Sequence, residues 1–232
     1  MALIAPSMLA VNFARLGEAL SEVKSLGASI IHIDVMDGHF GPEISVGQPV
    51  VGSVRQATEL ELDVHLLVER PERYLHDFIR AGADRLAIHI EATRNACRAI
   101  QLAKEHGVKV GLALQPETPV QDCFELLQEL DYLLILSAID VRGQAEFLRR
   151  TIGKVATAAR EREKQGLNFA IEVEGGIGPN EAEELAVAGA DILVVGSAIF
   201  GSNDRNEAMR ELTRRANPGF SNKRQETKPR VQ

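Results

Sequence analysis

The stretch Ile30-Ile31-His32-Ile33-Asp34-Val35-Met36-Asp37-Gly38-His39-Phe40 decides how the rest of this chain is interpreted. Its first half combines β-branched apolar residues over the length of one strand and runs into a glycine, a pattern typical of a buried β-strand. His32 and Asp34 are two positions apart, so a strand would place both side chains on the same face. A polar pair set into a buried strand needs an explanation, because buried polar groups normally have partners.

Two interpretations of this pair are open. The first is a structural hydrogen bond between His32 and Asp34 within a core. The second is a pair of ligands facing a cavity, with the imidazole as a neutral nitrogen donor and the carboxylate as a ligand or proton carrier. The stretch alone does not distinguish these two interpretations, so the choice between them depends on residues elsewhere in the chain.

Strand-like and helix-like segments alternate along the whole chain. The expected strands cover residues 3–7, 30–36, 60–66, 84–89, 108–114, 131–136, 168–173 and 192–195, and the expected helices cover residues 12–26, 49–57, 71–82, 93–106, 118–130, 144–164, 180–188 and 206–216. Strands that alternate with helices imply a parallel sheet. Eight such repeats in 232 residues favour an α/β fold of the TIM (β/α)8 barrel type over an open doubly wound sheet.

Glycines support one closed domain. Gly27, Gly82 and Gly189 each follow an expected helix and precede the next strand, where glycine supplies the left-handed residue that ends a helix. We therefore expect a single barrel domain over residues 1–217. The segment 218–232 is polar with several Lys and Arg residues, and we expect a disordered tail there.

The composition argues against several classes of partner. The net charge is −7, Trp is absent and aromatic residues make up 4% of the chain, so nucleic acid is not an expected partner. We find no apolar run of membrane-spanning length and no secretory leader pattern, and we expect a cytoplasmic protein without membrane contact. Cys97 and Cys123 show no C-x-x-C spacing, so we expect neither a disulfide nor a thiolate metal site.

Polar residues recur where three of the expected strands end, which is where TIM barrels carry functional groups. His32 and Asp34 lie on the second strand, His65 on the third, and Glu172 and Glu174 share a face of the seventh, with Glu174 nearer the loop. One histidine on an apolar strand is more often a packed core residue. Two histidines and two carboxylates at one rim, with Glu174 rather than Glu172 nearest that rim, instead favour a site for Zn²⁺, Mn²⁺ or Fe²⁺.

Glycine-rich turns follow the last two expected strands. They read Gly175-Gly176-Ile177-Gly178-Pro179 and Val195-Gly196-Ser197-Ala198. In TIM barrels the loops after strands seven and eight, with a short extra helix, recurrently bind phosphate through bare backbone N–H groups. Each turn is a weak signal by itself, but together they predict a phosphorylated ligand.

These residues are similar to the ribulose-phosphate 3-epimerase family over residues 3–216. The segments that carry the resemblance are Ile4-Ala5-Pro6-Ser7-Met8-Leu9-Ala10, His32-Ile33-Asp34-Val35-Met36-Asp37-Gly38-His39-Phe40, Leu62-Asp63-Val64-His65-Leu66 and Ala190-Asp191-Ile192-Leu193-Val194-Val195-Gly196-Ser197-Ala198-Ile199-Phe200. The resemblance implies an isomerase of carbohydrate metabolism that acts on a sugar phosphate of the pentose phosphate type. It also implies a homo-oligomer and one bound divalent metal ion, Zn²⁺ first, with Mn²⁺, Fe²⁺ or Co²⁺ as alternatives.

The resemblance also implies roles for individual residues. The implied metal ligands are His32, Asp34, His65 and Glu174, and the implied acid and base are Asp34 and Glu174. The implied reaction removes a proton from a carbon next to a ketone and returns one to the other face. Two carboxylates can act as base and acid in this reaction, beside a cation that stabilises the enediolate. The implied substrate contacts are Ser7, Met36, Leu67, Gly175, Gly176, Gly196 and Ser197.

Three features depart from the family pattern. Glu174 stands where the family has Asp, which changes the reach of the acid by about 1 Å. Leu67 and Leu136 replace family methionines and so remove polarizable sulfur near the substrate. The loop Ile139-Asp140-Val141-Arg142-Gly143-Gln144 replaces the glycine-rich lid Asn-Pro-Gly-Phe-Gly-Gly-Gln. Arg142 is either a replacement phosphate contact or a solvated loop arginine.

Three functional hypotheses follow. We prefer a metal-dependent ketose-phosphate 3-epimerase, with D-ribulose 5-phosphate and D-xylulose 5-phosphate as the default pair. A hexulose or tetrulose phosphate is the alternative substrate, since the departures cluster at substrate contacts. A lyase or aldolase on the same barrel is disfavoured because no Lys stands at an expected strand end. A non-catalytic phosphosugar-binding paralogue is the third hypothesis, motivated by Glu174 and the altered loop.

Overall fold

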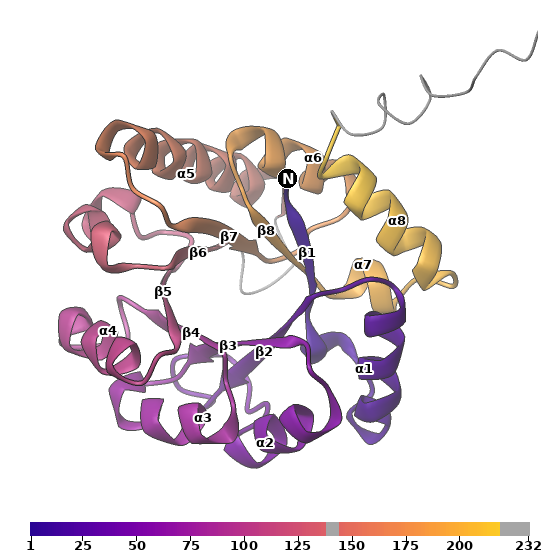
Figure 1. Ribbon diagram of the computed structural model, residues 1–232. Helices are drawn as coiled ribbons and strands as arrows, with labels where there is room; N and C mark the ends of the chain where they lie inside the picture. Colours follow the sequence, from indigo (N-terminus) through magenta and orange to yellow (C-terminus); the bar gives the residue numbers. More distant parts are fainter. Residues whose placement is uncertain (138–143, 219–232) are drawn as a thin grey trace, which may run out of the picture.

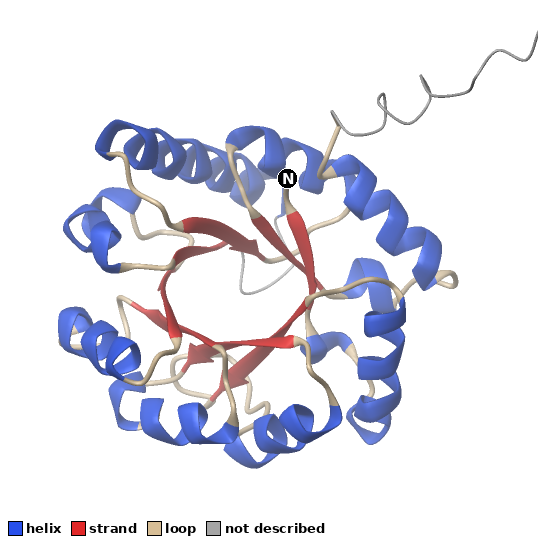
Figure 2. Cartoon of the chain, viewed as in Figure 1, coloured by secondary structure: helices blue, strands red, loops and turns tan. Residues whose placement is uncertain are grey.

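A ring of parallel strands forms the centre of the molecule, and helices surround it (Figures 1 and 2). The computed structural model describes residues 1–137 and 144–218, except for the side chains of 144–148. Within these residues the strands are β1 (Leu3–Pro6), β2 (Ile30–Met36), β3 (Glu61–Leu67), β4 (Arg85–His89), β5 (Lys109–Leu114), β6 (Tyr132–Leu136), β7 (Ala170–Glu174) and β8 (Ile192–Val195). Their order is β1-β8-β7-β6-β5-β4-β3-β2, and a parallel bridge between Ser7 and His32 joins the two ends. The predicted TIM barrel is confirmed.

The helices pack against the outer face of the ring. They are α1 (Leu16–Ser25), α2 (Gln48–Ala57), α3 (Leu75–Ala81), α4 (Ala96–Glu105), α5 (Gln144–Gln165), α6 (Pro179–Ala188), α7 (Ser197–Phe200) and α8 (Arg205–Arg215), with 3₁₀ helices η1 (Met8–Ala10), η2 (Phe13–Arg15), η3 (Pro71–Arg73) and η4 (Val120–Glu129). In the described part of the chain, no helix is both long and apolar enough to cross a membrane.

Four expected helices differ in type or start. The helix expected over 71–82 begins as the 3₁₀ helix η3, and α3 starts only at Leu75. The segment predicted as a helix over 118–130 is the 3₁₀ helix η4, which the apolar spacing did not distinguish from an α-helix. Asn12 caps as expected, but it caps the 3₁₀ turn η2 by accepting from the Ala14 N–H, and α1 begins only at Leu16. The helix expected from residue 93 begins at Ala96, because Asn95 accepts from the Arg98 N–H and so fixes its N-terminus.

The alternation of side chains along each strand separates two cores. On β2, Ile31, Ile33 and Val35 belong to the large core between strands and helices, whereas Ile30 and Met36 belong to clusters inside the ring. His32 and Asp34 have the same parity as Ile30 and Met36, so they face the interior of the barrel. The alternation along β2 therefore places His32 and Asp34 inside the barrel, where both are buried from water.

Glycine ends the helices where the sequence predicts it. Gly27, Gly82 and Gly189 have φ angles of 89°, 98° and 116°, in the left-handed region. Each lies between a helix and the next strand, so the short connections of a βα repeat are possible without strain.

Candidate active site and metal centre

Four polar side chains from three strands meet at one end of the ring. β2 contributes His32 and Asp34, β3 contributes His65, and β7 contributes Glu174 as its last residue. The strand register aligns Asp34 with His65, so these two side chains are cross-strand neighbours. Glu174 comes from the side of the ring opposite His65, because three strands separate β7 from β3 in either direction.

The donor atoms of this set lie close enough for one ion. One ligand atom from each of His32, Asp34, His65 and Glu174 can be chosen so that all lie within 4.8 Å of one another. His65 Nδ1 lies 2.9 Å from Glu174 Oε2 and 3.2 Å from Asp34 Oδ1. His32 Nε2 lies 3.3 Å from Asp34 Oδ1 and 3.4 Å from Glu174 Oε2. The extra methylene of Glu174, compared with aspartate, does not keep its carboxylate away from the set.

His32 has the hydrogen-bonding pattern of a neutral metal ligand. Its Nδ1 lies 2.6 Å from Asp63 Oδ2, whereas its Nε2 is fully buried and has no hydrogen-bond partner among the described residues. A proton on Nδ1, donated to Asp63, leaves the Nε2 lone pair directed at Asp34 and Glu174. Metal-bound histidines commonly have this outer carboxylate, which fixes the tautomer. Two imidazoles and two carboxylates therefore fit a divalent cation of the Zn²⁺ type in donor chemistry and in charge.

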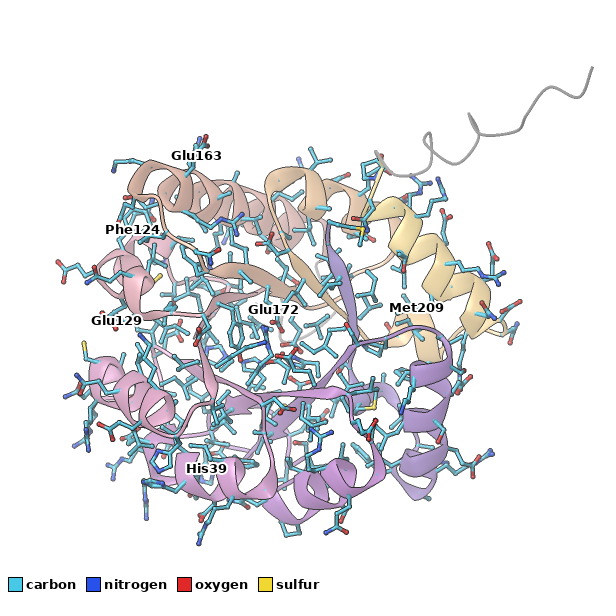
Figure 3. All side chains as sticks on the ribbon, viewed as in Figure 1. His39, Phe124, Glu129, Glu163, Glu172 and Met209 are labelled. Carbon is cyan, nitrogen blue, oxygen red and sulfur yellow. The ribbon has the colours of Figure 1, made fainter. Side chains whose placement is uncertain are left out.

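A second group of possible ligands lies deeper in the ring and already has a cation. Its members are His32, Asp63 and Glu172. Arg85 Nε donates to Asp63 Oδ1 at 3.1 Å, and the Arg85 guanidinium donates to Glu172 Oε2 at 2.5 Å. Figure 3 shows Glu172 inside the ring of strands. The guanidinium supplies the positive charge here, so this group supports the outer site and is a poor metal site itself.

Burial and neighbouring charges shift the pKa values of the site residues in opposite directions. Burial lowers the pKa of His65, but contacts with Asp34 and Glu174 outweigh it and raise this pKa to about 9. Burial also lowers the pKa of His32, yet the charges of Asp34, Glu174 and Asp63 raise it well above its usual value. Burial raises the pKa of Asp34, and His32 and His65 bring it below the usual range. The pocket thus strongly favours positive charge between its carboxylates.

A chain of hydrogen bonds leaves the site on the far side of His65. His65 Nε2 lies 2.9 Å from His89 Nε2, and His89 Nδ1 lies 3.0 Å from Glu91 Oε2. Burial lowers the pKa of His89, and the neighbouring His65 lowers it further. Burial raises the pKa of Glu91, but hydrogen bonds from His89, Thr118 and the Gln115 N–H lower it to about 2.

The predicted substrate residues on β1 to β3 line the same end of the ring. Ser7 is buried and donates its hydroxyl to Asp34 Oδ2 at 3.1 Å. Met36 and Leu67 are register partners and form an apolar cluster with Leu136 inside the ring. Phe40 packs against this cluster. An apolar surface therefore lies beside the four polar groups.

The predicted phosphate residues follow β7 and β8. Gly175 and Gly176 have φ angles of 109° and 64°, a backbone shape that glycine adopts at little cost. A Cβ on Gly196 would lie 3.1 Å from Ala10 Cβ, so glycine allows η1 and this turn to approach. Ser197 is exposed and begins the short helix α7. Arg142 lies outside the described residues.

Several residues of this site were not predicted from the sequence. They are Asp63, Arg85, His89, Glu91 and Tyr132, whose hydroxyl donates to Asp63 Oδ1 at 2.8 Å. Asp63 could have been found, because it stands two positions before His65 and shares its face. The partners of the others depend on contacts across the ring, which no local pattern indicates.

Comparisons with known proteins agree with the geometry. The model of the "Ribulose-phosphate 3 epimerase family" matches residues 3–200. A ribulose-phosphate 3-epimerase from Bacillus subtilis (strain 168) is 43% identical over 210 residues, which cover 90% of this chain and 97% of that protein. A chloroplastic ribulose-5-phosphate-3-epimerase from Arabidopsis thaliana is 39% identical over 212 residues, or 90% of this chain and 75% of that protein.

Solved structures of lower sequence similarity share the fold. A 3-hexulose-6-phosphate synthase from Salmonella typhimurium has a TM-score of 0.68 at 19% identity, covering 92% of this chain and 98% of that one. A phosphoribosyl anthranilate isomerase from Thermococcus kodakaraensis has a TM-score of 0.66 at 17% identity, covering 94% and 100%. At such identities the likeness concerns the barrel alone.

Proposed function

Because this chain belongs to the ribulose-phosphate 3-epimerase family, we propose that it epimerises a ketose phosphate at C3, with D-ribulose 5-phosphate and D-xylulose 5-phosphate as the substrate pair. The observation that carries the proposal is the convergence of His32, Asp34, His65 and Glu174. Such a reaction moves one proton from a carbon next to a ketone and returns one to the opposite face. It needs an acid, a base and a stabilised negative charge on the ketone oxygen.

The four convergent residues would hold a divalent cation, Zn²⁺ first, with Mn²⁺, Fe²⁺ or Co²⁺ as alternatives. When bound, the cation would supply a positive charge that stabilises the charge developing on the ketone oxygen. The donors would be Nε2 of His32, whose ring is held by Asp63 through Nδ1, Nδ1 of His65, and the carboxylates of Asp34 and Glu174. Two negative charges against one divalent ion leave the buried site close to neutral.

Asp34 and Glu174 are the proposed acid and base. Both carboxylates belong to the convergent set, and the strands that carry them lie in different parts of the ring. One would remove the C3 proton while the other returns a proton to the other face. Ser7 donates to Asp34 Oδ2 and so holds one oxygen of this carboxylate in place. Positioning of this kind contributes to rate because proton transfer depends on short, aligned contacts.

The surroundings suit a small phosphorylated sugar. Met36, Leu67 and Leu136 place apolar surface beside the reacting groups, which would exclude water from the planar intermediate. The glycine turns after β7 and β8 would bind the phosphate through backbone N–H groups of Gly175, Gly176, Gly196 and Ser197. Assembly into a homo-oligomer and the domain boundary near residue 217 remain predictions.

The test combines isotope exchange with metal removal. Purified protein incubated with ribulose 5-phosphate in D₂O should incorporate deuterium at C3 and form xylulose 5-phosphate. Treatment with EDTA should abolish both, and Zn²⁺, Mn²⁺, Fe²⁺ or Co²⁺ should restore them. Asp34→Asn and Glu174→Gln should each lower the rate at least about 100-fold, as expected for loss of an acid or base.

The matched control is Glu184→Gln, which removes an exposed carboxylate on α6, outside the ring. It should retain the parental rate. Tetrulose and hexulose phosphates tested in the same way would reveal a different substrate preference. Binding of phosphosugars without exchange at C3 in any of them would overturn the proposal in favour of a non-catalytic binding protein.

A further inference from the structure

His65 presents its two ring nitrogens to opposite environments. Nδ1 faces Asp34 and Glu174, and Nε2 faces His89 Nε2 at 2.9 Å. A nitrogen that binds a metal must carry a lone pair, and a neutral imidazole has only one such nitrogen. If Nδ1 is the ligand atom, the ring proton must be on Nε2, and His89 must accept it.

The same reasoning fixes the next ring. His89 can accept at Nε2 only if its own proton is on Nδ1, which lies 3.0 Å from Glu91 Oε2. The other oxygen, Glu91 Oε1, accepts from the Gln115 backbone N–H at 2.8 Å. An ionised carboxylate can only accept hydrogen bonds, so Glu91 requires the proton of His89 on Nδ1 and this end of the chain has a fixed direction. The direction is transmitted through His89 to His65.

Packing keeps the chain in place. The side chains of His65 and His89 are fully buried, and the Glu91 side chain is 22% exposed. The centroids of the His65 and His89 rings lie 5.0 Å apart, as expected for two rings joined edge to edge by the bond between their Nε2 atoms, and the Phe40 ring lies 4.9 Å from the His89 ring. Neither imidazole can rotate freely to exchange its two nitrogens.

We infer that Glu91 and His89 are positioning residues which orient the lone pair of His65 Nδ1 toward the cation site. The inference rests on the proposed metal site and extends it to the two residues that follow His65 in the hydrogen-bond chain. It parallels the role of Asp63 at His32, except that a whole imidazole lies between the carboxylate and the ligand ring. Neither residue touches the proposed cation, and their effect is exerted through the tautomer of His65.

Glu91→Gln should reverse the direction of the hydrogen-bond chain without changing the size of the side chain. Gln has one acceptor and one donor group, and the Gln115 N–H requires the acceptor. The amide NH₂ then faces His89 Nδ1, so this nitrogen must become an acceptor and the His89 proton moves to Nε2. His65 in turn must place its proton on Nδ1, which directs N–H toward the cation site. The charge change alone is reproduced by Glu117→Gln, an exposed residue on the neighbouring rim loop.

The experiment uses the full chain with ¹⁵N-labelled histidine. NMR of the Zn²⁺-loaded parent should show His65 protonated at Nε2 and His89 protonated at Nδ1. In Glu91→Gln the His89 proton should move to Nε2, and the Kd for Zn²⁺ measured by chelator competition should rise about 10–100-fold. Glu117→Gln should change neither quantity. His89→Gln, whose side-chain carbonyl can accept from His65 Nε2, should retain more affinity than Glu91→Gln and should be insensitive to a second change at Glu91.

The outcomes separate this inference from the proposed function. A His89 proton on Nε2 in the parent protein, or equal Zn²⁺ affinity in the parent and Glu91→Gln, would overturn the positioning role. Failure of the parent to bind any divalent cation would instead refute the proposed metal site. In that case the His89 tautomer in the metal-free parent and in Glu91→Gln still decides whether the hydrogen-bond chain has the inferred direction.

Discussion

Gly111 on β5 faces the ring of Tyr132 so closely that a larger residue must displace the ring. A Cβ atom on Gly111 would lie 2.8 Å from Tyr132 Cε1 and closer still to Cζ and Cε2. Tyr132 is fully buried, its hydroxyl donates to Asp63 Oδ1 at 2.8 Å, and the Arg85 guanidinium carbon lies 3.8 Å from the ring centre. The ring cannot yield without breaking this hydrogen bond, so Gly111→Ala should destabilise the fold strongly.

The expected cost follows from two contributions. Overpacking of a dense interior costs about 1–3 kcal/mol, and loss of a hydrogen bond to a charged carboxylate costs about 1.5–3 kcal/mol. We expect Gly111→Ala to lower the free energy of unfolding by about 3–5 kcal/mol, which for a domain of this size lowers Tm by about 6–20 °C. Because Asp63 also holds His32, the variant should weaken binding of Zn²⁺ as well.

Urea unfolding followed by circular dichroism measures this cost, with two comparisons. Gly153→Ala on α5 adds a methyl group with no atom within 4 Å and should stabilise by about 0.5–1 kcal/mol, the usual helix-propensity gain. In a Tyr132→Leu background, Gly111→Ala should cost much less, because the ring is no longer there to collide. A Gly111→Ala protein as stable as the parent, or an unchanged cost in the Tyr132→Leu background, would refute the reasoning.

Three further outcomes are expected. Asp63→Asn should weaken Zn²⁺ binding about 10–100-fold in a chelator competition, since His32 loses the carboxylate that fixes its tautomer; an unchanged Kd would exclude that role. Glu91 has its folded pKa lowered to about 2, so the stability it contributes is present above about pH 4.5 and is lost as the pH falls toward 2. Acid unfolding of Glu91→Gln should therefore depend less on pH in that range, and parallel curves would contradict this. Arg70 has a left-handed φ of 52°, so Arg70→Asn should stabilise by about 0.5–1 kcal/mol in urea, and a destabilised variant would show that the arginine side chain makes a valuable contact.

Much of the barrel could be predicted because its information is local. Strand parity, helix-ending glycines such as Gly82 and Gly189, and the order of elements all depend on neighbours in sequence. The same parity assigned His32 and Asp34 to one face of their strand. The sequence did not predict the helix type at η4, because the apolar spacing of a 3₁₀ helix resembles that of an α-helix.

The sequence by itself determined the fold class, because alternating side chains and strand ends are encoded within a few residues of each other. It also carried the family resemblance, which implied the proposed ligand set. Only the tertiary structure decided the place of Glu172, which meets Arg85 deeper in the ring, whereas Glu174 lies in the outer set as the resemblance implied. It also decided that His89 and Glu91 follow His65 in one hydrogen-bond chain. Parity specifies which face a side chain occupies, but partners across a closed ring are set by register and closure, which bring together residues far apart in the chain.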